Sequence, residues 1–331
     1  MNHDLILEHL LAMQADVRDA VITGRTPDMA AVARSASADT IYAIDAVVEP
    51  IVERHCEELA RHVPLMLISE GLVDEHGQER PVVYPHGTPE EDAQIRLIID
   101  PIDGTRGFMY DKRSAWALAA VAPNRGRDTR LRDCEIAVMT ELPTSKMNLT
   151  DVAYAVKGRG VKAFRVNLTD STRADLPLAP SRSPGIEHGF MSVSNFFPGT
   201  KEIASRLMEK IAHALLGPAD VTRATVFDDQ YICTGGQFWE LISGKDRFCC
   251  DLRPAFYKIQ NQPAGLCCHP YDCAALLIAE EAGAIITDEA GRPLDMPLDT
   301  ETDVNWVGYA NPTLRQKIEP LLQAFLQAGG R

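Results

Sequence analysis

Residues 96–105 read Arg96-Leu97-Ile98-Ile99-Asp100-Pro101-Ile102-Asp103-Gly104-Thr105. The first half is an apolar run too short for a helix and rich in β-branched isoleucine, which predicts a buried strand. Pro101 has no N–H to donate, so we expect the strand to end there. Gly104 permits a sharp turn or the close approach of a ligand. The stretch therefore predicts a rigid strand that leads directly into a turn.

The end of this strand carries an oxygen-rich group of possible ligands. Asp100 and Asp103 are three residues apart, with the carbonyl of Ile102 between them. Such oxygens repel one another unless a hard cation lies among them, and Mg²⁺ or Mn²⁺ suits the set. The N–H groups of Gly104 and Thr105 could bind an anion, and the Thr105 hydroxyl could orient a water. Together these features indicate metal-assisted transfer of a phosphoryl group to water.

Two other interpretations fit residues 100–105 less well. A strand end whose aspartates cap a turn would account for one carboxylate better than for two. The motif of haloacid dehalogenase phosphatases also ends in Asp-Gly-Thr, but its two aspartates are two residues apart. The spacing here is three, with a proline between, so that motif does not match.

The segment resembles the first motif of the inositol monophosphatase family of Mg²⁺-dependent, Li⁺-sensitive phosphatases. A second segment, His269-Pro270-Tyr271-Asp272-Cys273-Ala274-Ala275, resembles the Trp-Asp-x-Ala-Ala motif with which the family opens a helix, with Tyr271 in place of Trp. Taken alone, Asp272 would be a helix-capping residue. Beside the first motif, in the expected order and separation, the resemblance implies that Asp272 binds the second metal ion.

The resemblance also implies a role for Glu70, which follows an expected strand at residues 64–68. It matches the glutamate of the family that binds metal and activates water. A second glutamate usually comes next in the family, but this chain has Gly71 there. The number of Mg²⁺ ions, two or three, therefore stays open.

Two further aspartates match family positions. Asp45 lies at the start of an expected helix, and the resemblance implies that it supports Thr105 in polarising the attacking water. Asp251 ends an expected strand at residues 248–251. It lies near the acidic residue that bonds substrate hydroxyls in inositol phosphatases, which implies a substrate-binding role.

Composition narrows the class of protein. The 331 residues are 45% apolar, enough for a large core, and 33 Lys+Arg against 47 Asp+Glu give a net charge of −14. This charge argues against nucleic acid and anionic membranes as partners. No apolar run approaches membrane-spanning length, and the N-terminus lacks the pattern of a signal peptide. We therefore expect a cytoplasmic protein.

The eight cysteines do not form a disulfide-dense pattern. Cys249-Cys250 and Cys267-Cys268-His269 invite comparison with zinc sites, but Cys-x-x-Cys spacing is absent. Buried, reduced thiols are the expected state, with a zinc site or a redox pair as the alternatives.

The resemblance covers roughly residues 5–325 and implies an α/β fold, the five-layer α/β/α/β/α sandwich of these phosphatases. We expect an N-terminal half, 1–180, with most of the metal site. The C-terminal half, 181–331, would hold the last metal ligand and the substrate loops. A homodimer is expected from the resemblance only.

The implied activity is a phosphomonoesterase acting on a small phosphorylated metabolite similar to inositol monophosphate. Glu70, Asp100, Ile102, Asp103 and Asp272 would hold the metals. The alternatives are a 3′(2′),5′-bisphosphate nucleotidase, a fructose-1,6-bisphosphatase and a histidinol-phosphate phosphatase; Arg106, which follows the Asp-Gly-Thr sequence, favours the last. From another class, Gly71 suggests a catalytically silent relative that binds metal or a phosphorylated ligand.

Overall fold

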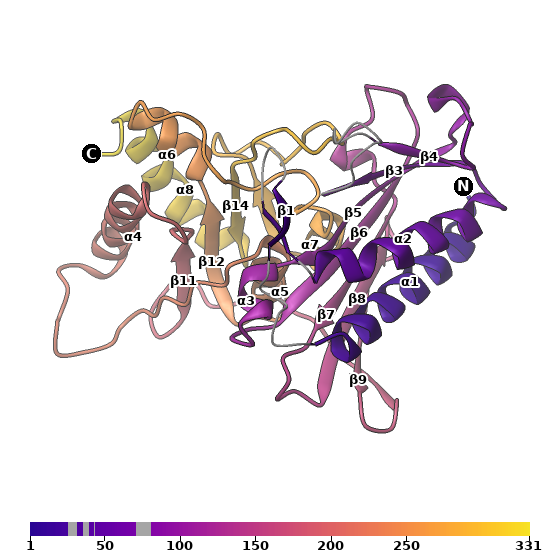
Figure 1. The fold of residues 1–331 in the computed structure, drawn as a ribbon. Coiled ribbons are helices and arrows are strands. Elements are labelled where there is room, and N and C mark those ends of the chain that lie inside the picture. Colours follow the sequence, from indigo (N-terminus) through magenta and orange to yellow (C-terminus); the bar gives the residue numbers. More distant parts are fainter. Residues whose placement is uncertain (26–31, 36–39, 43, 71–80) are drawn as a thin grey trace.

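Two β-sheets alternate with three layers of helices in this chain (Figure 1). The computed structural model describes residues 1–25, 32–35, 40–42, 44–70 and 81–331. Helices α1 and α2 cover the outer face of the larger sheet, and α5 and α7 lie between the sheets. Helices α4 and α8 cover the far face of the smaller sheet. The expected five-layer sandwich is thus confirmed.

The larger sheet has eight strands in the order β10-β9-β8-β7-β6-β5-β3-β4. All neighbours are antiparallel except β3 and β5, which are parallel. The strands are β3 (Leu65–Ser69), β4 (Val82–Tyr84), β5 (Ile95–Asp103), β6 (Ala115–Pro123), β7 (Ile136–Leu142), β8 (Leu149–Val156), β9 (Val161–Asn167) and β10 (Arg173–Asp175). A separate antiparallel pair is formed by β1 (Val32–Ser35) and β2 (Thr40–Tyr42).

The smaller sheet has the order β11-β12-β14-β13. Its strands are β11 (Phe190–Val193), β12 (Asp246–Asp251), β13 (Ile285–Thr287) and β14 (Trp306–Tyr309). The helices are α1 (His3–Thr23), α2 (Asp45–Ala60), α3 (Thr105–Met109), α4 (Lys201–Leu216), α5 (Thr234–Ile242), α6 (Arg253–Ile259), α7 (Leu276–Glu281) and α8 (Pro312–Gln327). The boundary expected near residue 180 falls between β10 and β11 and stays a prediction.

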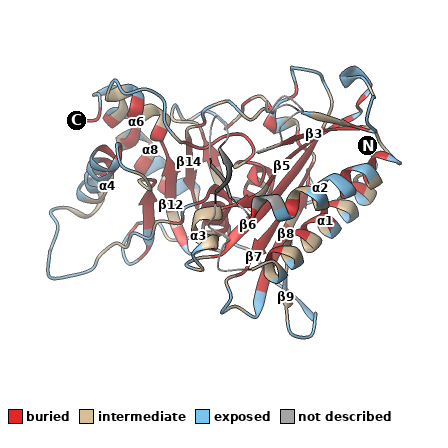
Figure 2. Cartoon of the chain, in the orientation of Figure 1, coloured by how far each residue is buried: buried red, intermediate tan, exposed pale blue. Residues whose placement is uncertain are grey.

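The central strands β3 and β7 are buried along their whole length, and β6 is buried except at its last residue, Pro123 (Figure 2). Helices pack on both faces of the larger sheet, so its strands are nearly continuous apolar runs rather than alternating ones. One core cluster joins the outer face of this sheet to α1 and α2. A larger cluster joins its inner face to α5, α7 and the smaller sheet. The two sheets therefore share one hydrophobic core.

All eight cysteines are buried and free of disulfides. Across the residues that the structure describes, we find no helix with the length and apolar character needed to cross a membrane.

Candidate metal-dependent active site

The carboxylates of the first motif lie where β5 meets β6. The strand does not stop at Pro101 as expected but continues to Asp103 through a β-bulge. Asp100 pairs with Leu118 and Asp103 with Trp116, so three steps on β5 match two on β6. A bulge leaves residues outside the ladder, which is why a proline is tolerated here. The bulge is closed by the Ile102 N–H, which donates to Asp100 Oδ1 over 2.9 Å.

A turn and a short helix follow the bulge directly. Gly104 has a φ of +99°, a region that residues with a Cβ rarely adopt, and α3 begins at Thr105. A Cβ on Gly104 would also lie 3.1 Å from the Cβ of Cys233. The Thr105 hydroxyl donates to the Ile102 carbonyl over 2.8 Å. The glycine thus brings the threonine back over the carbonyl that was expected to bind metal.

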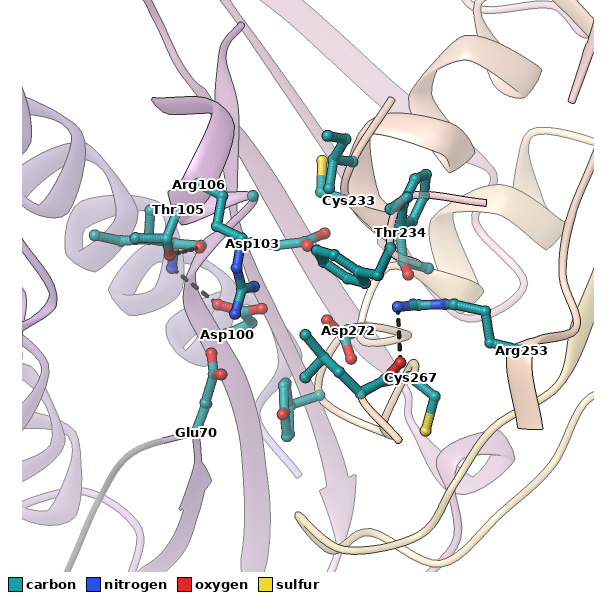
Figure 3. Close-up of a pocket in the computed structure, with 17 residues that line it drawn as sticks. Glu70, Asp100, Asp103, Thr105, Arg106, Cys233, Thr234, Arg253, Cys267 and Asp272 are labelled. Carbon is teal, nitrogen blue, oxygen red and sulfur yellow. Dashed lines mark hydrogen bonds between the residues drawn. The ribbon is translucent and has the colours of Figure 1, made fainter. Parts of the chain in front are cut away.

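Glu70 reaches the same place from the neighbouring strand. It directly follows β3, whose last residue, Ser69, pairs in parallel with Ile99 of β5. Carboxyl ends of parallel strands meet at one edge of a sheet, so Glu70 lies beside Asp100 (Figure 3). Gly71 lies outside the described residues.

Asp272 approaches from the other half of the chain. The sequence predicted that it opens a helix, but residues 270–275 form turns and α7 begins only at Leu276. Instead, its Oδ2 accepts the backbone N–H of His269 over 2.6 Å. Asp272 thus closes a tight turn and is held rigidly at the cavity.

Three carboxylates converge at this point. One oxygen each of Asp100, Asp103 and Asp272 lie within 4.8 Å of one another, and Asp100 and Asp103 are 2% and 4% exposed. Desolvation, followed by repulsion from Asp272, raises the pKa of Asp103 well above its ordinary value. Desolvation also raises the pKa of Asp272, to about 6. A buried, oxygen-only donor set of this kind fits a hard divalent cation.

The opposite wall of the site is the first turn of α5. The Gly235 N–H donates to Asp103 Oδ2 over 2.5 Å. A Cβ on Gly235 would lie 2.8 Å from Leu118 and 2.9 Å from Asp103 Oδ2. The helix can therefore approach β5 this closely only because a glycine stands there.

Asp251 does not line the cavity as expected; it is fully buried behind Arg253. Arg253 Nε donates to Asp251 Oδ1 over 2.9 Å and Nη2 to Oδ2 over 2.5 Å. Burial alone would lower the pKa of Arg253, but the charge and hydrogen bonds of Asp251 raise it. The guanidinium lies over the rings of Phe196 and Phe197, at 5.1 and 5.7 Å from their centroids. Arg253, which the sequence did not single out, therefore lines the cavity in place of Asp251.

The cavity encloses about 70 Å³. Its lining includes seven of the expected residues: Glu70, Asp100, Ile102, Asp103, Gly104, Thr105 and Asp272. A larger cavity of about 620 Å³ shares Gly104, Arg106 and Ile232 with it. Asp45 begins α2, but its side chain lies outside the part that the structure describes.

Comparison with known proteins gives a clear result for the fold. No family model and no curated protein matches the sequence. Among solved structures, the chain is similar to the IMPase of Thermotoga maritima, with a TM-score of 0.62 and 14% identity over 98% of both chains. It is also similar to fructose-1,6-bisphosphatase of Leishmania major, with a TM-score of 0.64 and 16% identity over 97% of this chain and 91% of that one.

A third similar structure is the extragenic suppressor protein SuhB of Bartonella henselae, with a TM-score of 0.64 and 16% identity over 96% of this chain and 98% of that one. The chain thus has the fold of these proteins along nearly its whole length.

Proposed function

We propose that this chain is a metal-dependent phosphomonoesterase of the inositol monophosphatase family, acting on a small phosphorylated metabolite. The fold neighbours support this, since they include proteins named IMPase and fructose-1,6-bisphosphatase. The observation that carries the proposal is the convergence of Asp100, Asp103 and Asp272 within 4.8 Å. These residues come from both halves of the chain, and both of the motifs that carry the resemblance supply them.

The residues around this point would hold Mg²⁺, or Mn²⁺ in its place. Carboxylate and carbonyl oxygens are the ligands these ions prefer. Glu70, Asp100, the Ile102 carbonyl, Asp103 and Asp272 together would hold two ions, or three. When bound, such ions neutralise charge on the phosphoryl group and lower the pKa of a bound water.

Thr105 and Glu70 would orient the attacking water. The proton of the Thr105 hydroxyl is donated to the Ile102 carbonyl, so the threonine oxygen would act toward water as an acceptor. Glu70 would take the proton that the water loses, and Asp45 would support the threonine from the start of α2. The N–H groups of Gly104 and Thr105 would hold the phosphate oxygens in line with the water.

Arg106 and Arg253 both stand beside the catalytic cavity, and the leaving alcohol would extend past Arg106, which also lines the larger cavity. The catalytic cavity, about 70 Å³, is much smaller than the adjoining one of about 620 Å³, so the larger part of a sugar or nucleotide phosphate would lie in the adjoining cavity. Both arginines line the catalytic cavity. Both carboxylate oxygens of Asp251, the residue expected to bind substrate hydroxyls, accept hydrogen bonds from Arg253 instead. This arrangement favours a substrate with a second anionic group, a bisphosphate of a sugar or nucleotide, over inositol monophosphate.

The proposal is tested by phosphate release from four substrates with and without Mg²⁺ and Li⁺. The panel contains inositol 1-phosphate, fructose 1,6-bisphosphate, 3′-phosphoadenosine 5′-phosphate and histidinol phosphate. We expect Mg²⁺-dependent, Li⁺-inhibited release, faster from the bisphosphates than from inositol 1-phosphate. If a protein that binds Mg²⁺ in calorimetry releases no phosphate from any of them, the catalytically silent alternative is favoured instead.

Asp103→Asn and Asp272→Asn should each reduce release by roughly 100-fold or more, because even an outer-shell partner of a metal site contributes 10- to 100-fold. Asp246→Asn is the matched control. Asp246 is also a buried carboxylate, and desolvation raises its pKa to about 7, but it lies outside the cavity lining. Unchanged Mg²⁺-dependent turnover in a folded Asp103→Asn protein would contradict the proposed mechanism.

The remaining expectations concern assembly and location. We propose that the chain forms a homodimer, because the family resemblance implies it, and that it acts in the cytoplasm. Analytical ultracentrifugation of the full chain decides the first point, since a monomer at micromolar concentration would exclude a stable dimer.

A further inference from the structure

A second cluster of metal-ligating side chains lies beside the turn that carries Asp272. The Sγ of Cys267, a ring nitrogen of His269 and a carboxylate oxygen of Asp303 all lie within 4.8 Å of one another. Cys267 and His269 are 6% and 7% exposed, whereas Asp303 is exposed. The proposed phosphatase chemistry uses none of these three side chains.

The backbone holds the two segments of this cluster in register. Cys268 and Val304 form an antiparallel bridge, and the Val304 N–H donates to the Cys268 carbonyl over 2.9 Å. Residues on either side of the bridge therefore face each other at fixed positions. In this antiparallel register His269 stands opposite Asp303, and Cys267, two residues before His269, lies on the same face and diagonal to Asp303.

Side-chain hydrogen bonds orient two of the three groups. The Cys267 thiol donates to Asp303 Oδ1 over 3.0 Å. His269 Nδ1 lies 3.2 Å from the Thr302 carbonyl and donates to it. A ligating histidine typically makes such a bond to a carbonyl with its other ring nitrogen, because the bond fixes the ring and its tautomer.

We propose that Cys267, His269 and Asp303 form a second metal site, selective for Zn²⁺ over Mg²⁺. Sulfur, imidazole nitrogen and one carboxylate oxygen are the donors that Zn²⁺ accepts in tetrahedral sites, whereas Mg²⁺ prefers oxygen alone. With three protein ligands, the fourth position falls to water. Binding breaks the Cys267 S–H bond, forms a Zn–S bond and releases the proton to the buffer.

This site uses other side chains than the oxygen-only cluster but adjoins it, since Cys267 also lines the catalytic cavity. In Figure 3 the sulfur of Cys267 points away from the carboxylates of Asp100 and Asp103. The next ligand along the chain, His269, donates its backbone N–H to Asp272 Oδ2. A zinc ion would therefore tie the 302–303 segment to the turn that positions Asp272.

Cobalt spectroscopy of the full chain in excess Mg²⁺ tests the proposal, with Co²⁺ as the probe for Zn²⁺. We expect one equivalent of Co²⁺ to give a thiolate-to-cobalt charge-transfer band, which Zn²⁺ then abolishes. Oxygen ligands alone cannot produce this band, so it reports on a cysteine ligand.

Variants locate the binding site. Cys267→Ser should remove the band. Asp303→Asn, at an exposed position, should weaken Zn²⁺ binding in calorimetry by more than the roughly 10- to 100-fold that is typical when a residue hydrogen-bonded to a metal ligand is lost. Cys56→Ser, at a buried thiol on α2, should change neither. Asp103→Asn should also keep the band, so failure of the phosphatase proposal would not affect this one. A band that survives Cys267→Ser, or no band at all, would overturn the zinc site.

Discussion

At the scale of single residues, Asp251 and Arg253 form a buried ion pair in which each charge compensates the other. The side chains are 0% and 6% exposed and make contacts as short as 2.5 Å. Loss of one partner leaves an uncompensated buried charge, which costs about 3–5 kcal/mol. We therefore expect Asp251→Asn to lower the free energy of unfolding by about that amount and to raise KM, because Arg253 loses its fixed position.

Urea unfolding of Asp251→Asn, with Asp4→Asn as its control, measures this effect. Asp4 pairs with Arg159 over 3.0 Å, but the two side chains are 79% and 55% exposed. Exposed pairs contribute less than about 1 kcal/mol. Equal losses in the two variants would mean that the buried pair does not hold the arginine.

Glu141 gives a pH dependence of stability outside the metal site. It is 9% exposed, and desolvation raises its pKa from 4.5 to about 6 although Ser114 donates a hydrogen bond to it. Between these values the folded protein binds more protons than the unfolded chain. Glu141 therefore lowers stability as pH rises from 4.5 to 6, and the cost is complete above pH 6.

Glu141→Gln should remove that cost. Relative to the parent protein, the variant should gain roughly 2 kcal/mol in free energy of unfolding between about pH 4.5 and pH 7.5, at about 1.4 kcal/mol per pKa unit. The new amide also accepts one hydrogen bond fewer than the carboxylate does. That loss is the same at both pH values, so it cancels when the two stabilities are compared. Denaturant unfolding of both proteins at both pH values tests this prediction. Free energies of unfolding that change in parallel with pH in the two proteins would refute it.

The sequence was informative about residues whose role depends on local spacing. Asp100, Asp103, Gly104 and Thr105 lie within six positions, so a strand followed by a turn was enough to group them. Arg253 was missed because its place depends on contacts with Asp251, Leu266 and the Phe196–Phe197 pair. No local pattern encodes those contacts.

At the scale of elements, the site depends on how closely α5 approaches the bulge of β5. Gly235→Ala would place a methyl group 2.9 Å from Asp103 Oδ2 and 2.8 Å from Leu118. We expect the helix to shift outward, with a loss of Mg²⁺ affinity and turnover of roughly 10- to 100-fold, because the N–H bond to Asp103 is an outer-shell contact of the metal site.

Gly107→Ala on α3 is the matched control for this substitution. A Cβ there meets Arg113 Cβ at 3.7 Å, an ordinary contact, and the backbone does not have positive φ. Mg²⁺ calorimetry on both variants tests the idea, and phosphate release is measured on Gly235→Ala alone because Gly107 lines the larger cavity. An unaffected Gly235→Ala protein would show that the close approach of α5 is not needed.

Two element boundaries show what the sequence could not supply. Pro101 predicted a strand end, yet β5 continues because the bulge absorbs the missing donor. The sequence predicted a helix start at Asp272, yet its carboxylate accepts a hydrogen bond from the His269 N–H and α7 begins only at Leu276. Proline does disfavour a strand interior and aspartate does favour a helix start, but in both cases a contact elsewhere in the fold outweighed the local preference.

At the scale of the whole molecule, the sandwich was predicted from a family resemblance rather than from hydrophobic periodicity. Strands such as β6 are apolar on both faces, so periodicity alone cannot separate them from buried helix. The order of strands in each sheet depends on long-range pairing, for instance β12 between β11 and β14, which the sequence does not state. The two motifs, far apart in the sequence, contribute their carboxylates to one cluster: Asp100 and Asp103 from the first and Asp272 from the second.

The shared core predicts that the two halves unfold together. Trp116 of β6 and Trp239 of α5 pack with ring centroids 4.9 Å apart and ring planes tilted by 36°, across the boundary between the expected halves. Met66 of β3 and Phe248 of β12 belong to one core cluster. We therefore expect tryptophan fluorescence and far-ultraviolet circular dichroism to report one coincident transition in urea.

Mg²⁺ should move this single transition as a whole, because its proposed ligands come from both halves. Ion that binds only the folded state stabilises it by about 2.7 kcal/mol at a free concentration of about 100 Kd. Asp103→Asn should remove most of that shift without splitting the transition. Two separate transitions, or a Mg²⁺ shift seen by only one probe, would mean that the halves are independent domains and that the metal site does not join them.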